Sequence, residues 1–183
     1  MKGVNTMKLL GKGAFTKAYL KDDGKTVLLK TVDPIKECMA LGWFPDHKLF
    51  PVISRTDNDE ECEMMYYPRV SSLKRALKPA QWELYKELRG IAHKIDLEIL
   101  NTKNKHYTLD IVRNGFKMMK SKTLSRVMIS ATEACSNYGP DVRFEIRQCN
   151  VRAHKGNLIL LDCFFIWSKL QEVRNEQKRR LNY

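Results

Sequence analysis

The hydrophobic period of this chain changes along its length, and these changes restrict the possible folds more than any other feature of the sequence. Before residue 67 the chain carries short β-prone segments separated by turn residues, the clearest of which are 8–10, 17–20 and 26–31. From Ser71 onward apolar residues recur at helical spacing, and strand-like segments return after Pro140. The sequence therefore predicts an α+β fold in which a small antiparallel sheet of about five strands is followed by helices.

Local turn and cap signals add detail to the predicted sheet. The run KDDG at 21–24 predicts a hairpin in which Gly24 takes a positive φ. Asp33 followed by Pro34 predicts an N-cap and a first helical position, and Gly42 predicts the end of that short helix. We therefore expect one helix inserted into the sheet.

Four stretches after residue 70 have the apolar spacing of helices. They are 71–77, 80–95, the long run 110–139 and the carboxyl-terminal run 164–181. Between the last two lie the strand-like segment 142–146 and a hairpin whose turn is HKGN at 154–157. No repeat or linker separates the two parts of the chain, so we expect them to pack on each other across a cleft near residues 67–71.

The composition favours a soluble globular protein without covalent or metal cross-links. Of the 183 residues, 43% are hydrophobic and 30% are charged. The five cysteines are scattered, with no CxxC pair and no histidines at zinc-finger spacing, so we expect reduced thiols. The amino end lacks a secretory apolar region and no apolar run reaches about 18 residues, so we expect a cytoplasmic protein that does not enter a membrane.

A formal net charge of +12 predicts attraction to polyanions. Nucleic acid, an acidic protein and a ribonucleoprotein are all compatible with this charge. In the densest basic run, residues 169–180, glutamates alternate with basic residues. This spacing favours a solvated helical face over a dedicated nucleic-acid arm, while nonspecific contact between the basic surface and nucleic acid remains open.

Two segments of the first third have the residue types of a nucleotide-binding site. GKGAFTKAYL at 11–20 places two glycines and Phe15 between strands, where backbone N–H groups could approach phosphates under the phenylalanine. VLLK at 27–30 ends an apolar strand with Lys30, whose ammonium could meet the α and β phosphates. Each segment also has a simpler interpretation, as a glycine turn and as an edge lysine that points to water.

A third segment, EIRQCNVRAHKGNLILLD at 145–162, has the spacing of a phosphotransferase site. An acid is followed by a basic residue two positions later, an asparagine five positions later, and an aspartate twelve positions after the asparagine. A carboxylate at Glu145 could accept a hydroxyl proton, and oxygen ligands from Asn150 and Asp162 suit Mg²⁺. The three segments together are improbable by chance.

On these motifs the chain resembles the protein kinases, and most closely the compact early serine/threonine kinases of short-tailed bacteriophages. Their glycine loop and Asp-x-His-x-Gly-Asn signature correspond to LLGKGAFTKAYL and EIRQCN. The resemblance implies a minimal two-lobed kinase-like fold, with an N-lobe over residues 1–67 and a reduced helical C-lobe over 68–183. It also implies ATP and Mg²⁺ as cofactors.

The same resemblance assigns roles to individual residues. The implied nucleotide-binding residues are Gly11, Gly13, Phe15, Lys30, Glu37, Met65 and Tyr67, with Glu37 paired to Lys30 and residues 65–67 forming the adenine hinge. The implied catalytic residues are Glu145, Arg147 and Lys30, and the implied metal ligands are Asn150 and Asp162. A phage origin would place the protein in the host cytoplasm and suggest host transcription, RNA-processing or defence proteins as substrates or targets.

Departures from the kinase pattern keep a second function open. Glu145 stands where kinases have aspartate, and a displacement of about one ångström can cost about a hundredfold in rate. Cys163 and Phe164 replace the usual Phe-Gly, Phe144 replaces an arginine, and only 21 residues follow Asp162. We favour an active protein kinase, and the alternative is a pseudokinase that binds and inhibits a host protein or ribonucleoprotein.

Other interpretations of the sequence are a small-molecule kinase and an unrelated nucleic-acid-binding protein. HKGN at 154–157 is similar to the HxGN of small-molecule kinases. That alignment would put Arg152 in the place of the acid and leave four residues before Asp162, too few for a hairpin. We therefore interpret HKGN as a hairpin turn.

Overall fold

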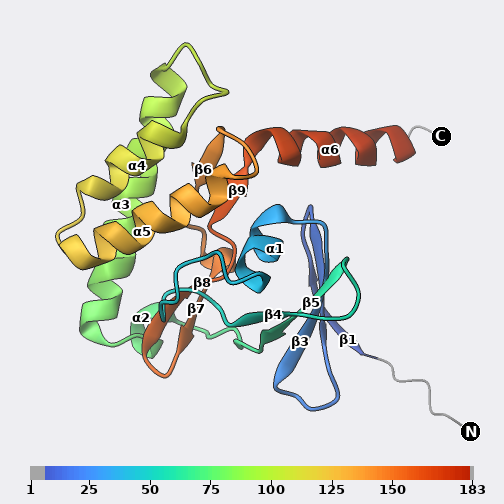
Figure 1. The fold of residues 1–183 in the computed structure, drawn as a ribbon. Helices are drawn as coiled ribbons and strands as arrows, with labels where there is room; N and C mark the ends of the chain where they lie inside the picture. Colours follow the sequence, from blue (N-terminus) through green and yellow to red (C-terminus); the bar gives the residue numbers. More distant parts are fainter. Residues whose placement is uncertain (1–6, 182–183) are drawn as a thin grey trace, which may run out of the picture.

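Five antiparallel strands form a sheet in the first third of the chain (Figure 1). The computed structural model describes residues 7–181. The strand order in the sheet is β1-β2-β3-β5-β4, with bounds β1 (Lys8–Lys12), β2 (Thr16–Leu20), β3 (Thr26–Thr31), β4 (Ile53–Arg55) and β5 (Glu61–Met65). The predicted small antiparallel sheet and the α+β class are confirmed.

One helix, α1 (Pro34–Ala40), lies between β3 and β4 in the chain. It begins where the sequence predicts, because the Asp33 side chain accepts a hydrogen bond from the Ile35 N–H at 3.0 Å. Gly42 follows it with a φ of 74°, and Gly24 has a φ of 64° in the β2–β3 turn. These local signals are confirmed because each depends on a few adjacent residues.

The sheet has one buried face and one exposed face. Val27 and Leu29 of β3 point to the buried face, where they pack with Cys62 and Met64 of β5 and with Ile159. Because side chains alternate along a strand, Leu28 and Lys30 lie on the opposite face. This alternation decides which side chains can reach the rest of the molecule.

The helical part differs from the prediction at one place. Its helices are α2 (Leu73–Ala76), α3 (Pro79–Asn101), α4 (Leu109–Lys117) and α5 (Lys122–Ser136), so the single long helix predicted over 110–139 is wrong. Ser121 caps α5 by accepting from the Leu124 N–H, and the Ser125 hydroxyl donates to the Phe116 carbonyl at 2.8 Å. The chain therefore turns back on itself at a serine cap, without a glycine or proline as a signal.

Two small strand pairs connect the helices to the carboxyl-terminal helix. β6 (Val142–Phe144) pairs with β9 (Phe164–Ile166), and β7 (Val151–His154) pairs with β8 (Asn157–Leu160). A short 3₁₀ turn, Gln148–Asn150, precedes β7. The HKGN turn is confirmed, with Lys155 at φ 50° and Gly156 at φ 78°.

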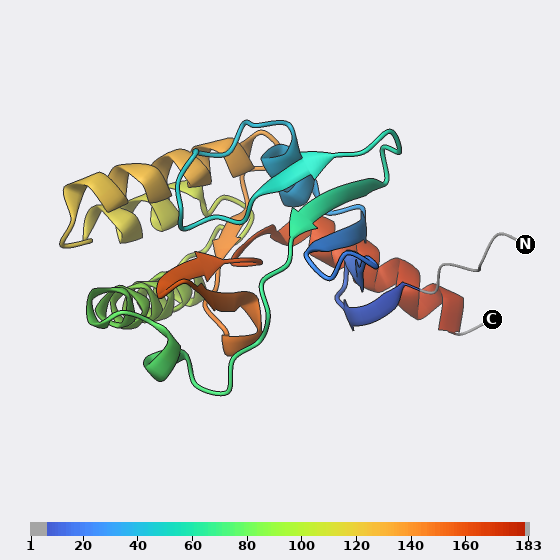
Figure 2. The same ribbon diagram turned by 90° about the horizontal axis from the view of Figure 1, so that it is seen from below.

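The last helix, α6 (Trp167–Leu181), begins later than predicted because residues 164–166 form β9. Buried Asp141 fixes this start: its carboxylate accepts from the Ser168 N–H at 2.6 Å and from the Ser168 hydroxyl at 3.2 Å. Figure 2 shows α6 running beside the amino-terminal strands. Within residues 7–181, none of the helices combines the length and apolar character needed to cross a bilayer.

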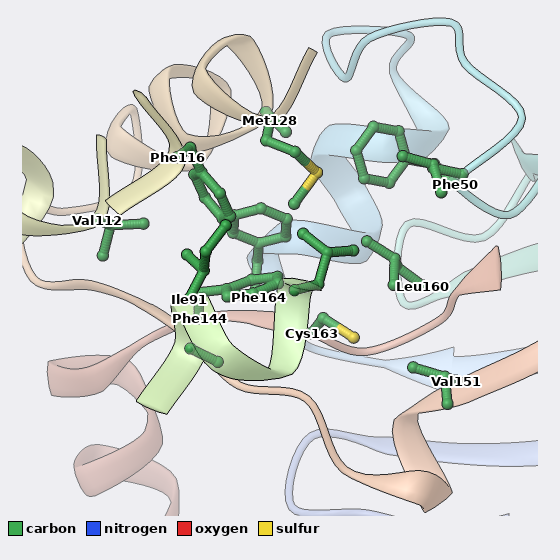
Figure 3. Close-up of a cluster of buried hydrophobic side chains, with 14 of the residues drawn as sticks. Phe50, Ile91, Val112, Phe116, Met128, Phe144, Val151, Leu160, Cys163 and Phe164 are labelled. Carbon is green, nitrogen blue, oxygen red and sulfur yellow. The ribbon is translucent and has the colours of Figure 1, made fainter. Parts of the chain in front are cut away.

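Three phenylalanines join β6, β9 and the helices in the main core (Figure 3). The Phe116 ring lies edge-on to Phe144 at a centroid distance of 4.8 Å, and Phe144 lies 5.0 Å from Phe164. Phe116 and Phe144 are almost completely buried. This aromatic cluster connects α4 to the strands that flank segment 145–162.

We expect Phe116→Ala to lower the free energy of unfolding by about 3–5 kcal/mol, because it removes a fully buried ring and leaves a cavity. Urea denaturation measures the change. The control is Leu100→Ala on α3, whose side chain is 66% exposed and should change the stability by less than about 0.5 kcal/mol. Equal effects of the two substitutions would contradict the described core.

Candidate functional site

A pocket of about 410 Å³ lies between the β1–β2 loop and segment 145–162, with α6 forming another wall. Its lining includes these residues selected from the sequence: Gly13, Phe15, Glu145, Arg147, Asn150 and Asp162. At least 130 positions separate the two loop residues from those of segment 145–162, so the fold brings the two groups together. We refer to this cavity as the acidic pocket.

Glu145, Arg147 and Asn150 form a connected group in the acidic pocket. The Asn150 amide nitrogen, Nδ2, donates to Glu145 Oε1 at 3.1 Å, and Arg147 Nη2 lies 3.0 Å from Glu145 Oε2. Since Nδ2 is used by Glu145, Asn150 Oδ1 remains for another donor, and the Cys149 thiol donates to it at 3.1 Å. The group holds a carboxylate and an amide oxygen in fixed relative positions.

Asp162 lies directly beside this group. The Asp162 N–H donates to the Asn150 carbonyl at 3.3 Å, and its side chain is 59% exposed toward the pocket. One carboxylate side chain and one amide side chain thus line the same pocket. They are hard oxygen donors, and Mg²⁺ in nucleotide sites is bound by one or two carboxylates together with phosphates.

Lys30 does not reach the acidic pocket, which corrects the expected role of this residue. It lies on the outer face of β3, and its Nζ pairs with Glu61 Oε1 of the neighbouring strand at 3.0 Å. The predicted partner, Glu37, is exposed on α1, so the expected Lys30–Glu37 pair is wrong. The reason is strand alternation: Val27 and Leu29 take the inward positions of β3.

A different lysine, Lys36 of α1, occupies the inner position. Its Nζ donates to the Leu161 carbonyl at 2.5 Å and to Asp162 Oδ1 at 3.2 Å, and it lies 3.9 Å from Asp33 Oδ2. Burial lowers the pKa of Lys36, but the carboxylates of Asp162 and Asp33 outweigh burial and leave the pKa above its ordinary value. Lys36 is therefore a buried ammonium behind Asp162 and Asp33, which line the acidic pocket while Lys36 itself does not.

The sequence contained a signal for Lys36, but the prediction considered only Lys30 at the end of the strand VLLK. Lys36 lies on a short helix that also carries Ile35 and Cys38, and the side chains of both these residues are buried. It also follows the capping Asp33 by three positions, which places the two side chains on one helical face. A basic residue on the apolar side of a helix requires a buried partner.

The predicted hinge residues lie outside the acidic pocket. Met65 is on the outer face of β5, and the buried Tyr67 accepts from the Val52 N–H through its hydroxyl at 3.0 Å. The N–H groups of Met65 and Tyr66 donate to the carbonyls of Val52 and Lys25. These two backbone donors are already used within the protein.

The two glycines of the β1–β2 region have different positions. Gly11 lies in β1 opposite Ala18 and does not line the acidic pocket. Gly13 lines it, and its N–H donates to the Thr16 carbonyl at 2.8 Å. A Cβ added at Gly13 would lie 3.7 Å from that carbonyl oxygen, an ordinary contact, so the protein's own packing does not require glycine there.

Helix α6 completes the site. Leu170 and Arg174 line the acidic pocket, and Gln177 Nε2 donates to the Ala14 carbonyl in the β1–β2 loop at 3.2 Å. Residues 170, 174 and 177 lie on one face of the helix. The helix therefore holds the loop from the carboxyl-terminal end of the chain.

Comparison with protein-family models, with curated proteins and with solved structures finds no match for this chain. Within residues 7–181, no cluster of three or more histidine, cysteine, aspartate or glutamate side chains could hold a metal ion alone. The function must therefore be inferred from the geometry of the acidic pocket.

Burial raises the pKa of Asp33 to about 6, and the charge of Asp162 adds to this shift while Lys36 opposes it. Between about pH 4 and 6 the folded state keeps a proton that the unfolded state has lost. The free energy of unfolding should therefore fall as the pH rises through this window, by up to roughly 3 kcal/mol.

Asp33→Asn should remove this part of the pH dependence, since asparagine also caps helices and does not ionise. Urea denaturation at pH 4, 5, 6 and 7 measures it. The matched control is Asp22→Asn, at an exposed position in the β2–β3 turn. A pH profile in Asp33→Asn that is unchanged from the wild type would contradict a protonated Asp33 in the folded state.

Proposed function

We propose that this chain is an Mg-ATP-dependent phosphotransferase of the protein-kinase type, which transfers phosphate to serine or threonine hydroxyls of a protein. The observation that carries the proposal is that Asp162 and Asn150 line the acidic pocket together with the β1–β2 loop, with the Lys36 ammonium buried against Asp162. A cation and two oxygen ligands beside a glycine-containing loop are the groups that a magnesium-bound triphosphate requires.

The β1–β2 loop would cover the phosphates. Gly13 lies at the pocket without a packing requirement for glycine, so an approach of backbone to phosphate explains its small size better than the fold does. Phe15 lines the same pocket and would close it against water. The volume of about 410 Å³ is in the range of small-molecule sites.

Lys36 would act through Asp162. Its Nζ is 3.2 Å from Asp162 Oδ1 and would orient this metal-binding carboxylate from the buried side. Mg²⁺, when bound by Asp162 and Asn150 Oδ1, would neutralise phosphate charge. These two residues fit the ion because their side chains carry hard oxygen donors and both line the acidic pocket.

Leu161, a partly buried member of the second hydrophobic cluster, would provide an apolar contact for the purine. Asp162 follows it directly in the chain, so a base packed against Leu161 would place its phosphates toward Asp162.

Glu145 would act as the general base. Its carboxylate is held by Asn150 and Arg147, so it is positioned to accept the proton of an acceptor hydroxyl. Arg147 and Arg174 line the same pocket and would stabilise negative charge on the transferred group. The chain thus has residues for each part of the transfer.

The order of elements supports a minimal kinase-like arrangement. A five-stranded sheet with one helix between β3 and β4 precedes the helices, and segment 145–162 follows them. In this interpretation residues 1–67 form the smaller lobe and residues 68–183 the larger lobe of one domain. The resemblance to phage kinases supports a host transcription, RNA-processing or defence protein as the substrate.

A pseudokinase that inhibits a host protein is the second candidate, and α6 is the observation that favours it. Gln177 ties α6 to the loop, and Leu170 and Arg174 occupy one side of the pocket. A protein acceptor must approach past this helix. In addition, both oxygens of the Glu145 carboxylate already have partners, Arg147 at one and Asn150 at the other.

Mg-ATP at about one hundred times its Kd should raise the Tm by roughly 5–10 °C, because it binds the folded state alone. Asp162→Asn should remove most of this shift; asparagine keeps an oxygen for the Lys36 ammonium, and urea denaturation checks that the variant is folded. The matched control is Lys30→Gln, which should keep the shift. A loss with Lys30→Gln and none with Asp162→Asn would reverse the assignment.

Transfer from labelled ATP to a host extract or to the chain itself should fall at least a hundredfold in Glu145→Gln, while the Mg-ATP thermal shift remains. Phosphorylation of serine or threonine supports the kinase. Nucleotide binding without transfer in the wild type would favour the inhibitor.

A further inference from the structure

Three lysines lie side by side on the outer face of the sheet. Lys12 of β1 is in register with Lys17 of β2, and Lys17 is in register with Lys30 of β3. Like charges directly opposite one another destabilise a sheet. Within residues 7–181, Lys30 alone of the three has an ion-pair partner, Glu61. We call these residues the lysine row.

The lysine row borders a groove of about 760 Å³ between the end of the sheet and α6. Arg180 of α6 lines the groove opposite the row, and Gln177 lines it too while it holds the β1–β2 loop. Two carboxylates, Glu60 and Glu61, also line the groove, and Glu61 lies directly beside Lys30. The groove therefore carries four basic groups against two acidic ones, one of which is already paired with Lys30.

One aromatic side chain lies among these charges. Phe15, at the tip of the β1–β2 loop, lines the groove as well as the acidic pocket. Sites for single-stranded nucleic acid combine a basic groove along the phosphates with aromatic rings on which bases stack. An acidic peptide would use the cations and gain nothing specific from the ring.

We infer that this groove binds single-stranded nucleic acid, with the lysine row and Arg180 on the phosphates and Phe15 against a base. Neighbouring strands are about 4.8 Å apart, so the row spans about 10 Å and can serve two successive phosphates of a flexible strand. The uncompensated charge of Lys12 and Lys17 costs stability in the free protein, and bound phosphates would relieve it.

This site does not depend on the proposed phosphotransferase. The lysine row is on the outer face of the sheet, whereas Asp162 lines the acidic pocket and Lys36 is buried behind it. Asp162→Asn should therefore lose the Mg-ATP shift and keep nucleic-acid binding. The row variant described below should do the reverse, so the two proposals can fail separately.

The test uses the full chain and a fluorescent twenty-base oligouridine, with anisotropy measured from 50 to 200 mM salt. Two phosphates at the row and one at Arg180 predict a slope of log K against log salt near −2.1, or a loss of about 18-fold over this range. The row variant, Lys12→Gln/Lys17→Gln/Lys30→Gln, should bind at least tenfold more weakly at 50 mM and reduce the slope by about 1.4.

The control variant removes the same charge from the helical part. Lys94→Gln/Lys103→Gln/Lys105→Gln alters three exposed lysines far from the groove and should bind within about twofold of the wild type. Phe15→Leu should weaken binding about tenfold with an unchanged salt slope, because stacking does not release counterions. Oligothymidine should bind like oligouridine, whereas polyglutamate of equal charge should compete poorly.

Folding is checked independently. The row variant should melt within a few degrees of the wild type, since the removed like-charge repulsion offsets the lost Lys30–Glu61 pair and no buried group changes. Equal weakening by the row and control variants would overturn the inference, as would undiminished binding in the row variant. Competition by polyglutamate as effective as oligouridine would also overturn it, because the groove would then take any polyanion.

Discussion

The buried Lys36 ammonium is the interaction on which the arrangement of this protein depends. It comes from the one helix inserted into the sheet, and it binds the Leu161 carbonyl and Asp162 more than 120 positions away in the chain. A charge buried in this way is stable only while its partners remain in place. The sheet and the carboxyl-terminal segments are thereby held at one relative position, and the acidic pocket lies at their junction.

Two lysines that are six positions apart in the chain, Lys30 and Lys36, therefore point in different directions. Lys30 is on a strand, where the alternation of side chains sends it outward, while Lys36 is on a helix, whose inner face turns it toward Asp162. The acidic pocket and the groove at the lysine row lie on different sides of the β1–β2 loop and share Phe15 and α6. One short loop thus contributes to two surfaces with different electrostatic character.

Features encoded by adjacent residues could be predicted from the sequence. The hairpin at Gly24, the Asp33 cap and the HKGN turn depend on local backbone preferences, and the structure has each of them. The spacing of Glu145, Asn150 and Asp162 also sufficed to find residues that meet in one pocket. The direction of Lys30 could not be predicted, because VLLK contains three successive apolar residues and no alternation that defines the inner face. The break between α4 and α5 could not be predicted either, because in the sequence the capping Ser121 looks the same as an exposed serine within a helix.

The attachment of α6 has a mechanical consequence. Its first turn is fixed to the core by Asp141, whereas its other end reaches across the β1–β2 loop. Arg180 follows Ser168 by twelve residues at about 1.5 Å each, so it lies about 18 Å along the helix from the contact with the Asp141 carboxylate. A tilt of the helix by about ten degrees at the Asp141 contact would displace Arg180 by about 3 Å. A small rearrangement beside β6 would therefore change the width of the groove at the lysine row.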